Sequence, residues 1–201
     1  MNEIEDLQKS VEDSLARGFY ILACNPKDKS PMARYSPHAV NSATNDPETA
    51  CRPYADGVPA NYGVACGQSN LTVADFDHGF KTLEDYEAWR QEWNIPETFT
   101  VVSGRDKGDL GIHAYYSGET TSTTFERGDV KGDLKSKGGY VVGPGRSILQ
   151  ERNTMSTKTF LSSLCREFSN SFLKRSIRFC PHQFLEALAW LSKKVLTGRP
   201  S

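Results

Sequence analysis

The feature that most constrains this chain is a short apolar segment that ends in two aspartates, Val73-Ala74-Asp75-Phe76-Asp77. In an extended strand, residues two positions apart point to the same face. Asp75 and Asp77 are therefore predicted to share one face of a sheet, with Phe76 on the other. Two carboxylates on a rigid strand supply the hard oxygen ligands that Mg²⁺ and Mn²⁺ prefer. Asp-x-Asp pairs also occur at solvated strand ends and in turn caps, so the segment alone leaves both interpretations open.

Four other segments have the composition of short strands or turns and contain glycine or proline. They are the basic turn at 25–31 after an apolar run, the strand at 62–67, the strand at 111–116 with one histidine, and the acid, glycine turn, apolar strand and Pro-Gly end at 133–145.

This ordered set resembles the N-terminal domain of the bifunctional DNA primase/polymerases, which belong to the archaeo-eukaryotic primase superfamily and occur in plasmid, phage and prophage replication proteins. The family pattern is a Lys-x-Pro turn, a strand ending in glycine, an Asp-x-Asp strand, a Gly-x-His strand, and an acid before Gly-Tyr-Val-Val-x-Pro-Gly. The resemblance covers roughly residues 15–148 of this chain. It implies an α+β fold of two lobes, with mixed or antiparallel sheets flanked by helices.

The resemblance also implies roles for individual residues. The catalytic and metal-binding residues would be the acids Asp75, Asp77 and Asp133. The nucleotide-binding residues would be His113, Ser103, Arg105, Lys29 and Lys135. Asp129 lies close to Asp133 in the sequence and is the rival for the third acid. The loop after Arg105 departs from the family, because Asp106-Lys107-Gly108-Asp109-Leu110 lengthens it and adds two acids.

The chemistry of nucleotidyl transfer agrees with a set of three acids. A 3′-hydroxyl attacks an α-phosphate in line, and two Mg²⁺ or Mn²⁺ ions about 4 Å apart can activate the nucleophile and stabilise the leaving oxygen. Two such ions need roughly three carboxylates, because fewer acids would leave the cluster strongly cationic. The alternative interpretation of each acid is a surface loop residue, and that of His113 is a core histidine held by backbone hydrogen bonds.

Composition limits the alternatives. A chain of 201 residues with 37% hydrophobic residues can form one good core and a small appendage. No apolar run approaches the roughly 18 to 20 residues that cross a bilayer, and the acidic N-terminus is unlike a signal peptide. Five dispersed cysteines without a Cys-x-x-Cys pair indicate a reducing cytoplasm and no structural zinc. A cytoplasmic location without membrane contact is therefore expected.

The net charge of −1 hides an asymmetry between the two ends of the chain. Residues 1–145 have a balance of −8, and residues 146–201 a balance of +7. We therefore expect a catalytic domain at 1–148 and a basic helical appendage at 149–201, with two amphipathic helices that separate near Pro181. No Gly-x-x-x-x-Gly-Lys-Ser/Thr motif is present, so a helicase would have to be a separate partner.

Periodicity gives the expected order of elements. Helices are predicted at 4–17, from Asp46-Pro47 onward, and at 82–93, with Asp46 as the N-cap of the second helix and Pro47 in its first turn. Strands are predicted at 19–24, 62–66, 71–76, 98–103, 111–117, 128–134 and 139–143.

The sequence thus predicts a DNA primase/polymerase-type nucleotidyltransferase that makes or extends a primer in replication. Its partners would be a single-stranded DNA template, (deoxy)nucleoside triphosphates and, through the C-terminal helices, a helicase or another replication protein. Two alternatives remain open: a non-catalytic nucleic-acid-binding module with a primase-like fold, and a metal-dependent phosphoesterase or nuclease that uses the same acids.

Overall fold

The computed structural model describes residues 3–103, 108–144, 148–150 and 155–156. Its α-helices are α1 (Glu3–Ala16), α2 (Pro47–Ala55) and α3 (Leu83–Glu92), with one 3₁₀ turn at Ala39–Ser42. Its strands are β1 (Ile21–Cys24), β2 (Asn61–Ala65), β3 (Leu71–His78), β4 (Phe99–Ser103), β5 (Gly111–Ser117), β6 (Thr123–Arg127), β7 (Val130–Lys135), β8 (Tyr140–Val142), β9 (Ile148–Gln150) and β10 (Met155–Ser156).

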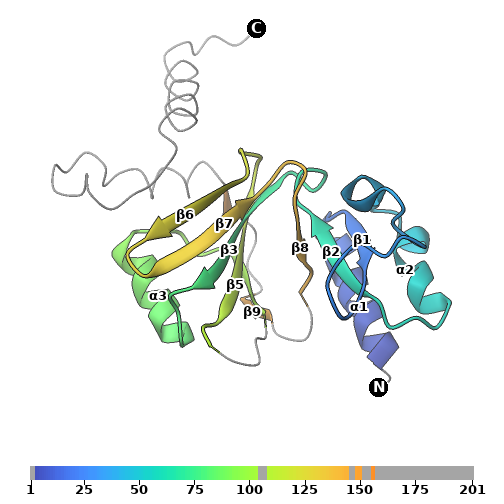
Figure 1. Cartoon of the computed structure of the whole chain (residues 1–201), viewed down its shortest axis with the longest axis horizontal. Helices are drawn as coiled ribbons and strands as arrows, with labels where there is room; N and C mark the ends of the chain where they lie inside the picture. Colours follow the sequence, from blue (N-terminus) through green and yellow to red (C-terminus); the bar gives the residue numbers. More distant parts are fainter. Residues whose placement is uncertain (1–2, 104–107, 145–147, 151–154, 157–201) are drawn as a thin grey trace, which may run out of the picture.

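The strands form two sheets that lie side by side (Figure 1). The small sheet has the order β1-β2-β8 and is antiparallel. The large sheet has the order β6-β7-β3-β5-β4-β9, and β10 adds to β5 in the parallel direction. Helices α1 and α2 lie beside the small sheet, and α3 lies beside the large one. The predicted α+β class with sheets flanked by helices is therefore confirmed.

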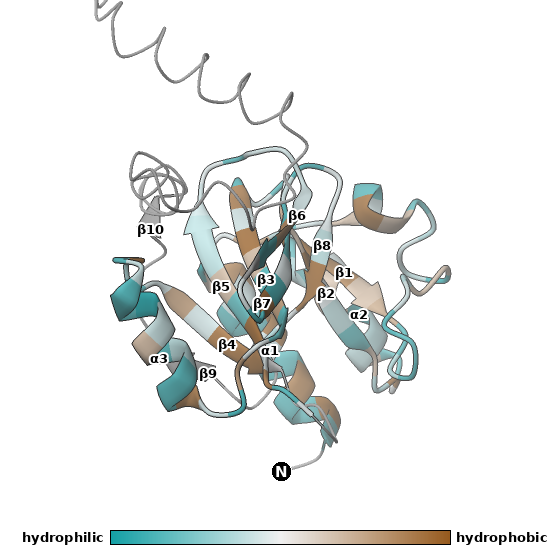
Figure 2. Cartoon of the chain, turned by 60° about the vertical axis from the view of Figure 1, so that its left-hand side comes forward, coloured by the Kyte–Doolittle hydropathy of each residue, from teal (hydrophilic) through white to brown (hydrophobic). Residues whose placement is uncertain are grey.

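Helix boundaries follow from capping residues. The side chain of Asp46 accepts a hydrogen bond from the backbone N–H of Thr49 at 2.9 Å, and Pro47 occupies the first turn of α2, as the sequence predicted. Thr82 and Asp85 form a capping box at the start of α3. The alternation of hydrophilic and hydrophobic residues along α1 and α3, visible in Figure 2, is that of helices with one face packed on a sheet.

The predicted strand at 128–134 is wrong in its boundaries. The structure has a hairpin there, in which β6 pairs with β7 and Gly128 and Asp129 form the turn. Gly128 has a φ of 59°, which suits a two-residue hairpin turn. Strand β6 was missed because it alternates weakly, with Phe125 its one large apolar residue. The predicted helices beyond residue 157 lie outside the described residues.

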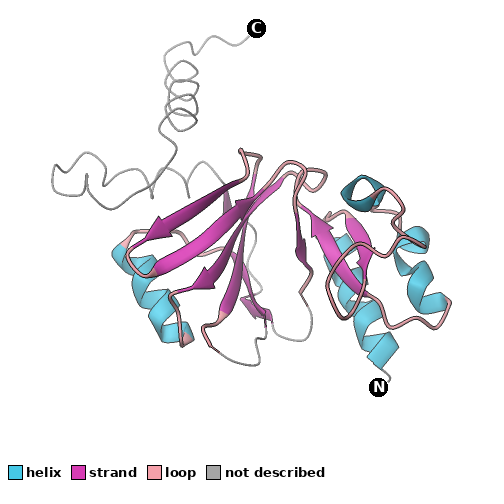
Figure 3. Ribbon diagram, in the orientation of Figure 1, coloured by secondary structure: helices cyan, strands magenta, loops and turns pink. Residues whose placement is uncertain are grey.

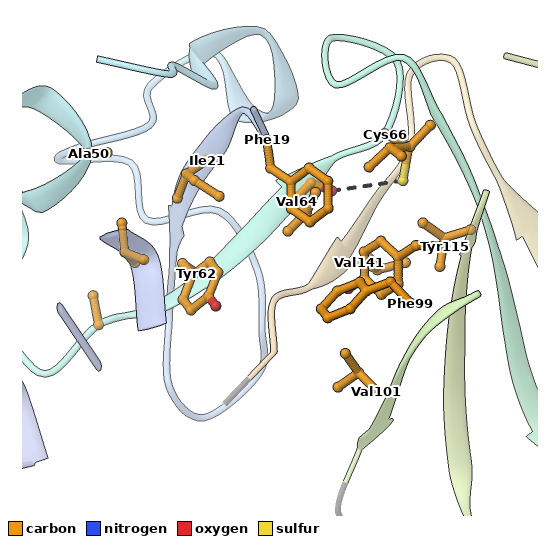
Figure 4. Packing of buried hydrophobic residues seen from close by; sticks show 14 of the residues in the cluster. Phe19, Ile21, Ala50, Tyr62, Val64, Cys66, Phe99, Val101, Tyr115 and Val141 are labelled. Atoms are coloured by element: carbon orange, nitrogen blue, oxygen red, sulfur yellow. Dashed lines mark hydrogen bonds between the residues drawn. The ribbon is translucent and has the colours of Figure 1, made fainter. Parts of the chain in front are cut away.

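Figure 3 shows the strands of the two sheets side by side. One hydrophobic core joins these sheets (Figure 4). The small sheet contributes Ile21, Val64 and Val141, and the large sheet contributes Phe99 and Tyr115. Phe19, just before β1, stacks on Tyr115 with the ring centroids 5.7 Å apart. These residues are at most 3% exposed. Their burial therefore holds the small sheet against the part of the large sheet that carries Phe99 and Tyr115.

A second core lies on the opposite face of the large sheet. The ring of Phe76 is at its centre, in edge-to-face contact with the rings of Phe80, Tyr86, Trp89 and Phe125. Two of these rings come from α3, so this helix covers the face of the sheet to which Phe76 points. The middle strand of the large sheet is thereby packed on both faces.

In the described part of the chain, no helix is both long and apolar enough to cross a membrane.

Candidate active site

Three of the predicted site residues lie in one row across the large sheet. Asp75 on β3 is the direct partner of Asp133 on β7 and, on its other side, of His113 on β5. Directly paired residues of antiparallel strands project to the same face. Val73 and Tyr115, two residues away on the same strands and so on this face, belong to the core between the sheets. The row therefore begins where that core ends.

His113 contacts Asp75 directly. Its Nε2 atom lies 3.2 Å from Oδ1 of Asp75, and the two side chains are 8% and 19% exposed. The Nδ1 atom of His113 is buried and, among the described residues, has no hydrogen-bond partner. The contact observed for this histidine is therefore with a carboxylate, and the predicted triphosphate contact stays a prediction.

Asp133 is bound by a lysine from its own strand. The ammonium group of Lys135 donates a hydrogen bond to Oδ2 of Asp133. Burial lowers the pKa of Lys135, but the hydrogen bond and the charges of Asp133, Asp75 and Asp77 raise it more, so that this pKa lies above its ordinary value. The ammonium group is thus hydrogen-bonded to Asp133, and the charges of Asp75 and Asp77 also favour its charged form.

Asp77 lies at an irregularity in β3. The register between β3 and β7 shifts between Phe76 and His78, so Asp77 is the extra residue of a β-bulge. A bulge re-aims the side chains around it. Asp77 and Asp133 line the same open pocket of about 300 Å³, so the bulged strand still brings these two acids to one cavity. The other lining residues are His78, Thr124, Phe125, Glu126, Lys131 and Gly132.

A glycine allows β7 to approach β3 closely at this point. A methyl group added to Gly132 would collide with the backbone carbonyl oxygen of Asp75 and would lie 2.8 Å from the ring of Phe125. The position next to Asp133 therefore has no space for any side chain.

The remaining predicted residues are placed as follows. Lys29 is exposed in the turn after β1, on the small sheet, and its carbonyl oxygen accepts a hydrogen bond from the Tyr140 hydroxyl at 3.2 Å. Ser103 ends β4 and pairs with Gly111 through the backbone. Arg105 lies outside the described residues. Asp129 is exposed in the β6–β7 turn, so the structure places Asp133, and not its rival, beside Asp75.

Sequence reasoning missed the contact that fastens the lengthened loop before β5. Oδ2 of Asp109 accepts a hydrogen bond from the backbone N–H of Gly79 at 2.9 Å and lies 3.7 Å from Nδ1 of His78. Leu110 donates its N–H to the carbonyl oxygen of Phe80. The side chain of Asp109 thus faces the end of β3. An Asp two residues before the predicted Gly-x-His strand was the one available signal.

Comparison with known proteins agrees with this geometry. The sequence profile of the family described as "Bifunctional DNA primase/polymerase, N-terminal" matches residues 12–164. The chain belongs to this family. No curated protein matches it. The family supports a primase/polymerase function in broad terms, and nucleotidyl transfer is the reaction type associated with it.

The donor chemistry of these acids suits a hard divalent ion, because Asp75, Asp77 and Asp133 offer carboxylate oxygens on one region of the sheet. Within the described residues, however, no three His, Cys, Asp or Glu side chains already converge as a ligand set. Asp75 is engaged with His113 and Asp133 with Lys135. These acids would hold an ion only after their side chains rearrange.

Proposed function

We propose that this protein is a metal-dependent primase/polymerase-type nucleotidyltransferase that synthesises or extends a primer on a DNA template. The observation that carries the proposal is the row formed by Asp133, Asp75 and His113, with Asp77 at the adjoining pocket. The three acids come from two neighbouring strands of the large sheet, in a chain that belongs to the primase/polymerase family.

The acids would bind Mg²⁺ or Mn²⁺ through Asp75, Asp77 and Asp133. The ions, when bound, supply charge stabilisation at the phosphates and activation of the attacking hydroxyl. The protein's own contribution is rigidity. Asp75 comes from β3, which is packed by a core on either face, and Asp133 comes from the neighbouring β7, which is packed by the second core; the His113 Nε2 atom lies 3.2 Å from Asp75. A carboxylate fixed in this way needs little reorganisation when its ligand arrives.

The triphosphate would be bound by basic and hydrogen-bonding groups around the acids. Lys135 already lies at the cluster, whereas Lys29 would approach from the small sheet. Ser103 and Arg105 begin the loop between β4 and β5, where an arginine can offer a bidentate contact to phosphate. The resemblance assigns His113 to this set as well, whereas its contact in the structure is with Asp75, so the two roles are alternatives that kinetics distinguishes.

The DNA template would be single-stranded, and the basic residues after 146 would contact nucleic acid or a separate helicase or replication protein. The net balance of +7 over residues 146–201 supports this assignment, because phosphate backbones are bound mainly through lysine and arginine. A cytoplasmic location accords with such a role.

The test is nucleotide incorporation on primed and unprimed single-stranded templates with Mn²⁺ or Mg²⁺. Wild type is compared with Asp75→Ala/Asp77→Ala and with Asp133→Asn. Asp129→Asn is the matched control, because it removes the same charge from the same hairpin at a position that faces solvent. We expect incorporation to be lost in the first two variants and kept in the control, with circular dichroism unchanged.

Other outcomes assign another function. Degradation of labelled DNA with metal alone, without dependence on triphosphates, would identify a nuclease that uses the same acids. Binding of DNA by a folded but inactive wild type, insensitive to metal and to the Asp75 and Asp77 variants, would identify a non-catalytic module.

A further inference from the structure

The acid cluster contains a cation of its own. Two lysines flank Asp133 at spacings of two residues, Lys131 and Lys135, and so lie on its face of β7. Lys131 is 3.0 Å from Glu126 across the hairpin and is largely exposed. Lys135 is about one-third exposed and is hydrogen-bonded to Asp133. Of these two lysines, Lys135 is therefore the one engaged with the acids.

A cation is needed at this position for electrostatic reasons. Asp75 and Asp133 are direct cross-strand partners, and like charges placed opposite each other destabilise a sheet. Asp77, which lines a pocket together with Asp133, adds a third negative charge. Without metal, an ammonium group that interacts with all three carboxylates relieves this repulsion.

A divalent ion would be held by the same carboxylates. An ion bound by Asp133 would compete with the Lys135 ammonium group for this carboxylate, because two cations on one carboxylate repel each other.

We propose that the Lys135 ammonium group acts as a built-in counter-cation that competes with divalent metal for the acid cluster and must leave Asp133 when metal binds. This inference rests on the proposed function, because it assumes that the acids bind metal. It makes Lys135 a residue that sets the metal affinity of the site.

Release of the Lys135 ammonium group also affects nucleotide binding. Lysine carries its charge on a flexible four-carbon side chain, so an ammonium group released from Asp133 stays within reach of phosphates bound at the cluster. Metal binding then frees Lys135 for the triphosphate, and the two ligands favour each other's binding by linkage.

The experiment measures Mn²⁺ binding to the full chain without nucleotide or DNA, by the electron paramagnetic resonance signal of free Mn²⁺. The variants are Lys135→Gln, Lys135→Met and Lys135→Arg. Lys137→Gln is the control, because it removes the same charge from an exposed position two residues further along. We expect Lys135→Gln and Lys135→Met to bind Mn²⁺ about tenfold more tightly than wild type. Lys135→Arg and the control should stay within about twofold.

Two further outcomes are distinguishable. If wild type binds Mn²⁺ in a manner that Asp133→Asn weakens, but the folded Lys135→Gln and Lys135→Met variants bind no more tightly than wild type, the competition is disproved and the metal site stands. If Asp75→Asn and Asp133→Asn leave Mn²⁺ binding unchanged, or wild type binds none, the acids are not a metal site. The proposed function and this inference then fail together.

Discussion

The Nε2 atom of His113 lies 3.2 Å from Oδ1 of Asp75, and the two residues are direct partners on adjacent strands. The two side chains project from neighbouring strands to the same face of the sheet, so their contact fixes the position of the Asp75 carboxylate. The family resemblance implies another partner for this histidine, the incoming triphosphate. The two roles have different kinetic consequences.

We predict that His113→Ala lowers kcat about 10- to 100-fold while the KM for nucleotide changes little, because groups that orient a metal-binding carboxylate act on the geometry of the reaction. His113→Gln should retain more activity, since its side-chain amide can donate to Asp75 from a similar position. Steady-state incorporation on a primed template measures both constants. A large rise in KM with unchanged kcat in both variants would instead establish the triphosphate role.

Gly132 is predicted to be irreplaceable for steric reasons. In Gly132→Ala the new methyl group would collide with the carbonyl of Asp75 and with Phe125, and forced overpacking typically costs about 1–3 kcal/mol of unfolding free energy. Activity should fall as well, because β3 must shift at Asp75. Urea unfolding followed by circular dichroism gives the free energy.

The matched control for that substitution is Gly139→Ala. A methyl group there would lie 3.3 Å from its nearest neighbour, the carbonyl oxygen of Ser136, so a smaller loss of stability is expected. Equal unfolding midpoints for Gly132→Ala and wild type would show that β3 and β7 can move apart at Gly132 without a loss of unfolding free energy.

The sequence predicted the strands and helices whose patterns were strong. The segment at 111–117 coincides with β5, because its residues are nearly all buried and its ends are marked by glycine and serine. Capping chemistry at Asp46 located the start of α2. The pairing of Asp133 with Asp75 was not in the local pattern. It depends on the register between β3 and β7, which is set by long-range packing.

Two features of the site lay beyond sequence reasoning for physical reasons. The bulge at Asp77 arises from a register shift against β7, and alternation along one strand does not reveal it. The Lys135–Asp133 contact is a choice among several neighbouring charges, decided by side-chain geometry. The glycine before Asp133 was visible in the sequence, but the close approach that requires it depends on which strand lies opposite.

Arg90 is predicted to be a structural residue of α3. It is 8% exposed, its guanidinium donates to the carbonyl oxygen of Ile95 at 2.9 Å, and it contacts Glu87 and Glu97 at 2.5 and 3.1 Å. Arg90→Ala would leave a buried carbonyl and two adjacent carboxylates without their cation. We expect a loss of about 2–3 kcal/mol of unfolding free energy, less than for a fully buried pair because both glutamates are partly exposed.

The control for this prediction is Arg34→Ala, which breaks a 3.2 Å ion pair with Asp56 whose arginine is 71% exposed. Exposed pairs contribute about 0–1 kcal/mol. Thermal or urea unfolding distinguishes the two variants, and an equal loss in both would mean that the burial of Arg90 has no energetic consequence.

Alkaline pH should destabilise the protein through its buried thiols. Cys66 is fully buried, and burial, followed by the negative charge of Asp75, raises the pKa of its thiol to about 12 from a usual 9.0. Between these values the unfolded chain releases the proton and the folded chain keeps it. The stabilisation is therefore fully present below pH 9 and is lost as pH rises toward 12. At pH 10.5, Cys66 accounts for about 1–2 kcal/mol of the loss relative to pH 8.

Urea unfolding at the two pH values should show a smaller loss in Cys66→Ala than in wild type. Cys51→Ala, at a half-buried position, should behave nearly as wild type. An equal loss of unfolding free energy in all three proteins would mean that folding does not raise the pKa of the Cys66 thiol.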